Sequence, residues 1–518
     1  MLFLKPIVFV LVLFSTLMGE ARSKVFEVSW RKGGMENALQ TAKEEKRPLL
    51  VYWGAVWCPP CNALKSRVFS DPKFIYATRN YIAVYLDGDT DDAQIWGEKL
   101  KAMGYPTLMV LSSQGEELVR LTPSATAEEM AQTLEVVVGE STSFLDKVLK
   151  WTPKSPLSGK DLDIIASFSW VQAPLLRTAG VGEKEKEEMK KSQRKLAEQL
   201  RAIAESNEKK TPEISLKIML NAMSLHLSSL KEKEDISKKV GSVYRRDLEK
   251  VFSSKQRAKE YLSQYVYLVG DLKERLYKNE GAKFQDRILN LMTEVRKNQD
   301  LTFEDKLNTL YPVIAFYKDS KTVPDDVKGV VKEVADQILK QVKDPKKRHV
   351  ALTDAAYYLH KVGESEKAKN ILESELKSSI SPYYLMSTLA YIESDQKNNE
   401  AALSWYRKAF EAPKGGATQL QWGYAYLAAL IRLKPKETGE ILKLAARLLQ
   451  ENTGRTDSFQ GRSGRILARA KTNLETWAKD QKETEKVKAI FQVAQSKCSK
   501  KNSKLSYYQQ SCKDYFVF

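Results

Sequence analysis

Two cysteines separated by two prolines, Cys58-Pro59-Pro60-Cys61, follow an apolar run at residues 48–53 after four intervening residues. A short run of this kind predicts a strand that is buried on both faces, and the pattern over residues 62–69 predicts a helix. The motif therefore lies where a buried strand turns into a helix. A cysteine at a helix N-terminus gains thiolate character from the unpaired N–H groups and from the helix dipole. We therefore expect Cys58 to be an exposed nucleophile, and Cys61, one turn later, to resolve the mixed disulfide that Cys58 forms.

The residues around this motif alternate between strand patterns and helix patterns. Further strands are predicted at residues 81–86, 107–111 and 117–121, with a helix through residues 96–100 and another at 126–137. Alternation of this kind is typical of an α/β domain. We place that domain at residues 24–140.

The motifs on either side of the cysteines resemble those of the thioredoxin family. Trp57 stands immediately before Cys58, and the segment Tyr105-Pro106-Thr107 follows later in the chain. The stretches 53–61 and 68–72 look most like the group of thioredoxin-like domains that includes the C-terminal domain of the disulfide reductase DsbD. The resemblance covers residues 25–138 of the 518 in the chain.

This resemblance implies a thioredoxin fold and thiol–disulfide exchange by Cys58 and Cys61, with no cofactor. In that family the proline that matches Pro106 follows a cis peptide bond, and its backbone pairs with the bound substrate strand. A cis bond is plausible at this position because proline lowers its cost. The resemblance therefore implies that Trp57, Tyr105 and Pro106 bind the substrate.

One position departs from the family pattern. Many thioredoxins carry a buried aspartate six residues before the first cysteine, where it takes the proton of the resolving thiol. Here that residue is Tyr52, which is neutral at physiological pH. We therefore expect resolution of the mixed disulfide to be slower, or to use water or another carboxylate.

The histidines of the chain bear on the direction of electron flow. Oxidising members of such systems stabilise the thiolate with a nearby cationic histidine, and this domain contains none, since the three histidines are His226, His349 and His360. This absence favours a reductant or an exchange catalyst.

Other uses of Cys58 and Cys61 remain open. A permanently closed structural disulfide is one alternative. A zinc site is another, although such a site needs about four ligands and the sequence nearby offers only these two. The acidic stretch 87–92 lacks the spacing of an EF-hand calcium loop. It predicts a solvated loop with a helix cap, and we expect no metal.

The chain changes character after the first domain. Residues 141–160 are rich in Ser, Pro and Gly and predict a connector. Beyond it, apolar residues recur at helical spacing almost to the C-terminus, which predicts an all-α region. Its first part, residues 161–345, shows no clean period.

A repeat is visible at residues 346–455. Ala368 and Ala402 occupy matching positions 34 residues apart, and the stretch 400–410 resembles tetratricopeptide repeats. Stacked helical hairpins of this kind form a concave face suited to holding a peptide or a protein. We therefore expect this region to bind a partner.

The last two cysteines, Cys498 and Cys512, lie within residues 456–518, where we expect a C-terminal helix and a tail closed by a disulfide. The two are 14 positions apart and bring the number of cysteines to four. An even number in an exported chain indicates a structural disulfide. A second redox pair is the alternative.

The first residues indicate the compartment. Lys5 precedes an apolar run at residues 6–14, and Ala21-Arg22-Ser23 fits a cleavage site. This pattern is typical of a secretory signal peptide, because the run is too short to span a bilayer. We expect residues 1–23 to be removed and the protein to be exported, most simply to a periplasm. An uncleaved N-terminal anchor is the alternative, because the cleavage site is weak.

These features together predict an extracytoplasmic thiol–disulfide oxidoreductase that acts on disulfide-containing envelope proteins and receives electrons from a membrane donor. The net charge of +18 favours acidic partners or anionic surfaces, or equally serves only to keep the protein soluble. Export argues against nucleic acid as a partner. The alternative is an interaction scaffold with a catalytically idle thioredoxin-like domain. Tyr52 favours that alternative, and the intact cysteine motif argues against it.

Overall fold

The structure is a computed structural model, and it describes residues 27–31, 34–102, 104–173, 183–232, 234–318, 320, 322–413, 415–453, 455, 458–459, 461–498 and 512–517. The predicted signal peptide, residues 1–23, lies outside the described residues. Among the helices described, none combines the length and the apolar character needed to cross a membrane.

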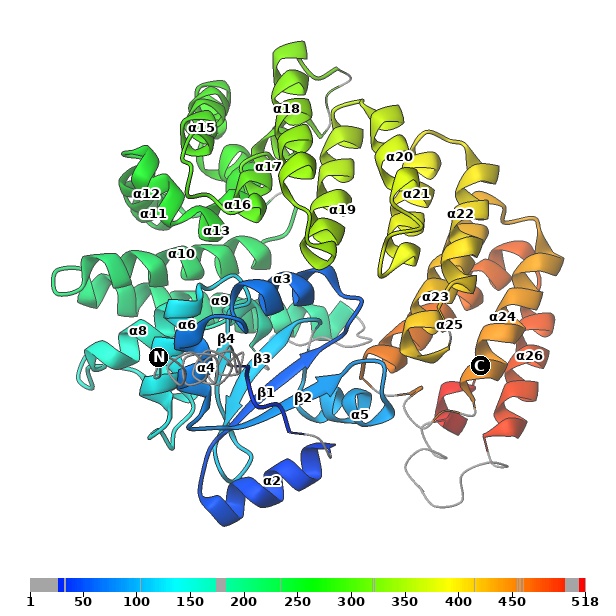
Figure 1. Ribbon diagram of the computed structural model, residues 1–518, viewed down its shortest axis with the longest axis horizontal. Coiled ribbons are helices and arrows are strands. Elements are labelled where there is room, and N and C mark those ends of the chain that lie inside the picture. The colour runs from blue at the N-terminus through cyan, green and yellow to red at the C-terminus, as the bar shows by residue number, and fades with distance from the viewer. Residues whose placement is uncertain are drawn as a thin grey trace, which may run out of the picture.

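The N-terminal part is a mixed four-stranded sheet covered by helices (Figure 1). The strand order is β2-β1-β3-β4, in which β1 pairs parallel with β2 and antiparallel with β3. The strands and the helices of this part are β1 (Leu49–Gly54), β2 (Ile82–Asp87), β3 (Thr107–Leu111), β4 (Glu117–Leu121), α2 (Gly34–Glu45), α3 (Pro59–Arg67), α4 (Pro72–Thr78), α5 (Asp91–Lys99) and α6 (Ala127–Val137). This is the α/β fold expected from the sequence.

The central strand β1 explains why the apolar run before the cysteines is continuous. Leu50 and Tyr52 point to one face of the sheet and join the large core under α3 and α6. Val51 and Trp53 point to the other face and join a smaller core with α2. Because both faces are covered, every residue of the strand is buried.

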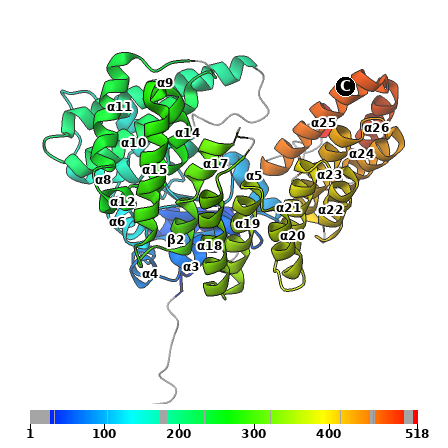
Figure 2. The ribbon, with the colours of Figure 1, turned by 90° about the horizontal axis from the view of Figure 1, so that it is seen from above.

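The rest of the chain is helical and curves around the sheet (Figures 1 and 2). Its helices are α7 (Phe144–Lys150), α8 (Gly159–Ser167), α9 (Glu183–Asn207), α10 (Pro212–Ser229), α11 (Lys238–Val251), α12 (Lys255–Glu260), α13 (Leu262–Tyr265), α14 (Val269–Asp271), α15 (Gly281–Arg296), α16 (Phe303–Asn308), α17 (Tyr311–Tyr317), α18 (Asp325–Gln341), α19 (Pro345–Lys361), α20 (Ser365–Ser374), α21 (Pro382–Asp395), α22 (Asn399–Glu411), α23 (Gly416–Leu433), α24 (Thr438–Asn452), α25 (Gly461–Gln481) and α26 (Thr484–Lys497).

The segment predicted as a connector, residues 141–160, is more structured than expected. It contains all of α7, whose Phe144 and Val148 are fully buried. They belong to one hydrophobic core that runs from Val28 in the sheet domain to Phe316 in the helical region. The two parts of the chain therefore share a core instead of being joined by a loose linker.

The predicted repeat region forms three consecutive helical hairpins, α19/α20, α21/α22 and α23/α24. Ala368 and Ala402 lie in the second helix of successive hairpins and are completely buried. A small side chain at each position lets the two helices of a hairpin approach closely. The assignment of these hairpins to the tetratricopeptide family stays a prediction.

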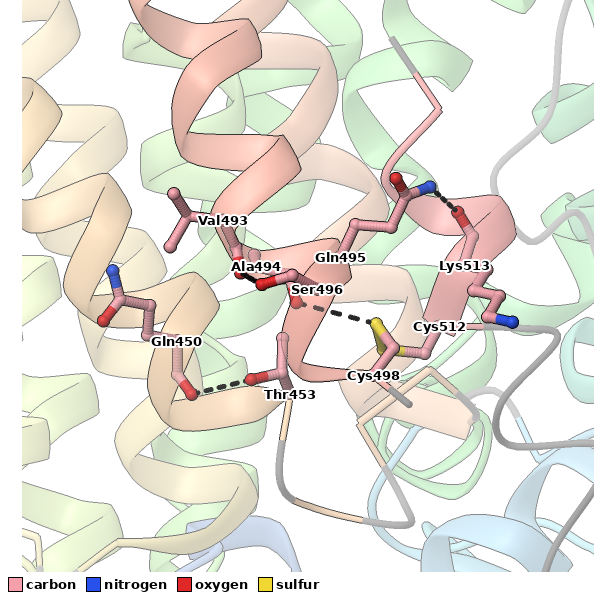
Figure 3. Close-up of a disulfide and its surroundings, with 9 residues drawn as sticks. All are labelled: Gln450, Thr453, Val493, Ala494, Gln495, Ser496, Cys498, Cys512 and Lys513. Carbon is pink, nitrogen blue, oxygen red and sulfur yellow. Dashed lines mark hydrogen bonds between the residues drawn. A yellow bond between two sulfur atoms is a disulfide. The ribbon is translucent and has the colours of Figure 1, made fainter. Parts of the chain in front are cut away.

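The C-terminal segment contains two helices, α25 and α26, where the sequence predicted one. A disulfide joins Cys498, at the end of α26, to Cys512, and the sulfur of Cys498 also faces the carbonyl of Ala494 (Figure 3). Both cysteines are buried in a core that includes Phe491 and Phe516. The bond thus attaches the last described residues to the end of the helical region.

Candidate functional site

The cysteine motif sits at the start of α3, as the sequence predicts. Cys58 is the N-cap, and Pro59 and Pro60 occupy the first turn, where a missing N–H costs nothing. The backbone N–H of Cys61 donates to the sulfur of Cys58 over 3.3 Å. Both cysteines are present as thiols. This geometry directs a backbone donor and the positive end of a helix at the first sulfur.

The expectation that Cys58 is exposed is wrong for this structure. Only 3% of its surface is accessible, and Cys61 is completely buried. The reason is that the helical region folds back over the motif. Helix α19 packs on α3 (Figure 1), and the ring of Tyr384 on α21 lies 5.9 Å from that of Trp57.

The three residues expected to bind substrate lie together beside the cysteines. The peptide bond between Tyr105 and Pro106 is cis, and the rings of Trp57 and Tyr105 are 5.7 Å apart with an edge-to-face geometry. The carbonyl of Pro106, however, accepts a hydrogen bond from Gln172 over 3.5 Å. The surface expected to receive a substrate backbone is therefore in contact with the chain itself.

Helix α25 forms the second contact between the helical region and the site. The guanidinium of Arg462 lies 4.8 Å from the ring centre of Trp57 and 5.1 Å from that of Tyr105. The backbone N–H groups of Arg462 and Ser463 both donate to the side-chain oxygen of Gln94, over 3.0 and 3.3 Å. Gln94 in turn donates to the hydroxyl of Tyr105 over 2.8 Å.

The acidic stretch after β2 also contacts the candidate site, which the sequence did not predict. One carboxylate oxygen of Asp89 accepts a hydrogen bond from the indole N–H of Trp57, and the other accepts from the hydroxyl of Thr418 on α23. Both distances are 2.5 Å. Asp89 therefore ties the indole beside Cys58 to the helical region. The helix cap expected in this stretch is supplied by Thr90.

Tyr52 lies beneath Cys61 in the core. Its hydroxyl is buried, with no hydrogen-bond partner among the described residues, and its ring stacks on that of Tyr85 at 5.1 Å. The ammonium group of Lys65 lies 5.7 Å from the ring centre of Tyr52 and 5.1 Å from that of Tyr85. A phenol and a cation thus lie on the inner side of Cys61.

The electrostatics of the two thiols differ. Burial raises the pKa of the Cys58 thiol, while the backbone N–H of Cys61 and the charge of Arg462 act to lower it. Burial also acts to raise the pKa of Cys61, but hydrogen bonds and the charge of Lys65 outweigh it, so that the pKa is lowered. Each sulfur therefore has a cation on its own side, Arg462 near Cys58 and Lys65 near Cys61.

A metal site is not apparent in the described part of the chain, where no group of three or more His, Cys, Asp or Glu side chains is arranged to hold an ion.

Sequence reasoning missed Tyr384 and Arg462, and it missed the role of Asp89. The first two lie more than 300 positions beyond Cys58, and neither belongs to a recognisable motif. The repeat pattern indicates a concave face but not which side chains point from it. Only the three-dimensional arrangement brings these residues to the cysteines.

Comparisons with known proteins agree with the fold of the N-terminal part. Residues 35–137 match the family model of a thioredoxin-like domain. The chain is similar to an H-type thioredoxin of Brassica oleracea, with 27% identity over 99 residues that cover 19% of this chain and 74% of the relative. It is also similar to thioredoxin H3 of Arabidopsis thaliana, with 28% identity over 97 residues, covering 19% and 76%. These matches support thiol–disulfide chemistry for the N-terminal domain at the level of the family.

Proposed function

We propose that this protein is an extracytoplasmic thiol–disulfide oxidoreductase, a reductant or exchange catalyst, whose helical region selects the partner. The observation that carries the proposal is the position of Cys58, which caps α3, accepts the N–H of Cys61 and directly follows Trp57, whose ring contacts that of Tyr105 before the cis Tyr105–Pro106 bond. A helix N-terminus favours the thiolate, which is the reactive form. The DsbD-like subtype remains part of the proposal.

The reaction starts from the dithiol form. The thiolate of Cys58 attacks one sulfur of a substrate disulfide; the substrate S–S bond breaks, and the first substrate sulfur leaves and takes up a proton. Cys61 then loses its proton and attacks the sulfur of Cys58. The mixed disulfide breaks, and the second substrate thiol is released. Two electrons have passed to the substrate, and the Cys58–Cys61 pair is a disulfide that a dithiol or a membrane electron donor must reduce.

Export is supported by the signal-like residues 1–23 and by the Cys498–Cys512 disulfide, because structural disulfides persist in oxidising compartments. We propose disulfide-containing envelope proteins as substrates. The hairpins α19 to α24 are the proposed partner-binding surface, since stacked helical hairpins serve this purpose in repeat proteins.

The second candidate is an interaction scaffold in which the cysteine pair is idle. One observation favours it, namely the burial of Cys58 under the helical region. A nucleophile with 3% of its surface accessible must be uncovered before a protein disulfide can reach it. The oxidoreductase proposal therefore requires α21 and α25 to move away from the site during turnover.

A trapping experiment separates the two candidates. The Cys61→Ser variant of the full chain, in which resolution is blocked, would be incubated with a protein disulfide such as that of insulin, and adducts mapped by mass spectrometry. The oxidoreductase predicts a mixed disulfide at Cys58. The Cys58→Ser variant is the control and should form none. No adduct at Cys58, under conditions in which dithiothreitol reduces the same substrate, would favour the scaffold.

A further inference from the structure

Cys58 has few charged neighbours within its own domain. The titratable groups that face it are Cys61 from α3, Tyr52 from β1, Tyr384 from α21 and Arg462 from α25, while Tyr105 and Asp89 both contact Trp57. Lys65 lies on the Cys61 side of the pair. The positive charge on the Cys58 side therefore comes from a helix more than 400 positions later in the chain.

The Arg462 side chain is aimed at the site. Its guanidinium lies over Trp57, the residue directly before Cys58, at 4.8 Å, and over Tyr105 at 5.1 Å. Its Nη1 atom is buried and has no hydrogen-bond partner among the described residues. A buried guanidinium nitrogen without a partner is costly, so its placement here calls for a compensating interaction.

The backbone holds this arginine in position. The first three N–H groups of α25 are used, because Gly461 donates to Glu98 and both Arg462 and Ser463 donate to Gln94. Gly461 has a φ of +52°, and a Cβ atom there would lie 2.5 Å from the carbonyl oxygen of Gln94. The start of α25 is thus fitted closely to α5, and its N-terminus is not an open anion site.

Resting on the oxidoreductase proposed above, we propose that Arg462 is the cation that stabilises the thiolate of Cys58, so that the helical region supplies part of the redox site. A positive charge near a thiolate favours the charged form, the more so where water is excluded. The negative charge formed on the Cys58 sulfur then offsets the cost of burying the Nη1 atom of Arg462 without a hydrogen-bond partner in the described part of the chain. The negative charge of Asp89 opposes thiolate formation, but both oxygens of this carboxylate already accept hydrogen bonds, from Trp57 and Thr418.

The test is the titration of Cys58 in the reduced full chain. Alkylation by iodoacetamide at a series of pH values, followed at Cys58 by mass spectrometry, reports the thiolate fraction. In Arg462→Gln the midpoint should rise by about one pH unit, which is about a tenfold loss of thiolate below the midpoint. Arg462→Lys keeps the positive charge, so its midpoint should lie close to that of the wild type.

Arg469→Gln is the matched control, since it removes the same charge from an exposed position two turns further along α25 and should leave the midpoint unchanged. An unchanged midpoint in Arg462→Gln would overturn the inference, as would an equal shift in Arg469→Gln.

This readout is independent of turnover. If the wild-type titration depends on Arg462 but Cys61→Ser traps no substrate, the inference stands and the proposed function fails. If trapping succeeds and the midpoint does not depend on Arg462, the proposed function stands and the inference fails.

Discussion

At the scale of single residues, the site is unusual in placing a phenol under the resolving cysteine. Tyr52 is buried beside Cys61, and its hydroxyl contributes to lowering the pKa of that thiol, together with the hydrogen bond to Cys58 and the charge of Lys65. A phenol that stays neutral cannot take a proton from Cys61 at physiological pH, but it can donate a hydrogen bond to the thiolate once that forms. The Tyr52 hydroxyl would then stabilise the attacking sulfur in the second step.

Removing this hydroxyl tests that role. In Tyr52→Phe the mixed disulfide between Cys58 and a substrate should resolve roughly threefold to tenfold more slowly, because Cys61 loses a donor to its thiolate. The fold should be as stable or slightly more stable, since a buried hydroxyl without a partner is removed. Rapid quenching and mass spectrometry would measure the lifetime of the mixed disulfide. A lifetime equal to that of wild type would assign Tyr52 a packing role only.

At the scale of elements, α19 joins the helical region to the redox helix. It packs on α3 and carries His349, whose ring meets that of Tyr384 edge-on at 5.7 Å. His349 is buried, and its Nε2 atom has no partner among the described residues. Burial lowers its pKa from 6.5 to about 4. The docking of α19 therefore depends on a neutral histidine.

This histidine predicts a loss of stability in acid. A folded-state pKa below the unfolded one means that the unfolded chain binds the proton first, so stability falls as the pH drops from 6.5 towards 4. Between pH 7.5 and pH 5 the wild type should lose about 2 kcal/mol more than His349→Phe. Denaturant unfolding of both proteins at the two pH values measures the difference. Equal losses of stability in the wild type and in His349→Phe would mean that His349 is protonated in the folded protein.

Much of the N-terminal domain is predictable from local patterns. The strands at 107–111 and 117–121 have the predicted bounds, and β1, β2, α3, α5 and α6 differ by up to about five residues at their ends, whereas α2 and α4 were not predicted. The reason is physical, since a strand buried on both faces needs an unbroken apolar run and a helix start needs a cap. These signals lie within a few residues of one another.

The surroundings of Cys58 were not predictable in this way. Its burial depends on Tyr384 and Arg462, which reach it only because α19 to α25 curve back over α3 and α5. Helical spacing shows which face of each helix is apolar, but not the angle at which successive hairpins stack. Helix α7 was missed for a similar reason. The polar and proline-rich stretches around it predict a linker, and the local sequence does not show that Phe144 is buried against the rest of the chain.

At the scale of the whole molecule, the helical region closes over the redox site through α19, α21 and α25. The contacts at α25 are mostly polar and depend on the close approach of Gly461 to Gln94. Such a contact can open without disrupting the hydrophobic cores on either side. Turnover on a protein disulfide requires this opening.

Gly461→Ala should favour the open form. A side chain at positive φ, in contact with a carbonyl, costs on the order of 1–3 kcal/mol, so the open population should rise about tenfold. The measurement is the ratio of alkylation rates at Cys58 by a bulky and by a small maleimide, because the thiolate fraction cancels in the ratio. Gly439→Ala, where a Cβ meets nothing within 4 Å, is the control and should not change the ratio. A ratio that also stays unchanged in Gly461→Ala would contradict gating at this contact.

The most direct test of the central claim is the redox equilibrium of the Cys58–Cys61 pair in the intact chain. The protein would be equilibrated with glutathione buffers, quenched and analysed by mass spectrometry of the peptide that carries both cysteines. With a cation near each sulfur stabilising the reduced form, we predict a reversible transition between about −230 and −180 mV, less negative than the about −270 mV of thioredoxin. A pair that does not exchange with glutathione at any ratio of its reduced and oxidised forms would contradict the oxidoreductase. The interaction scaffold would then be the remaining candidate.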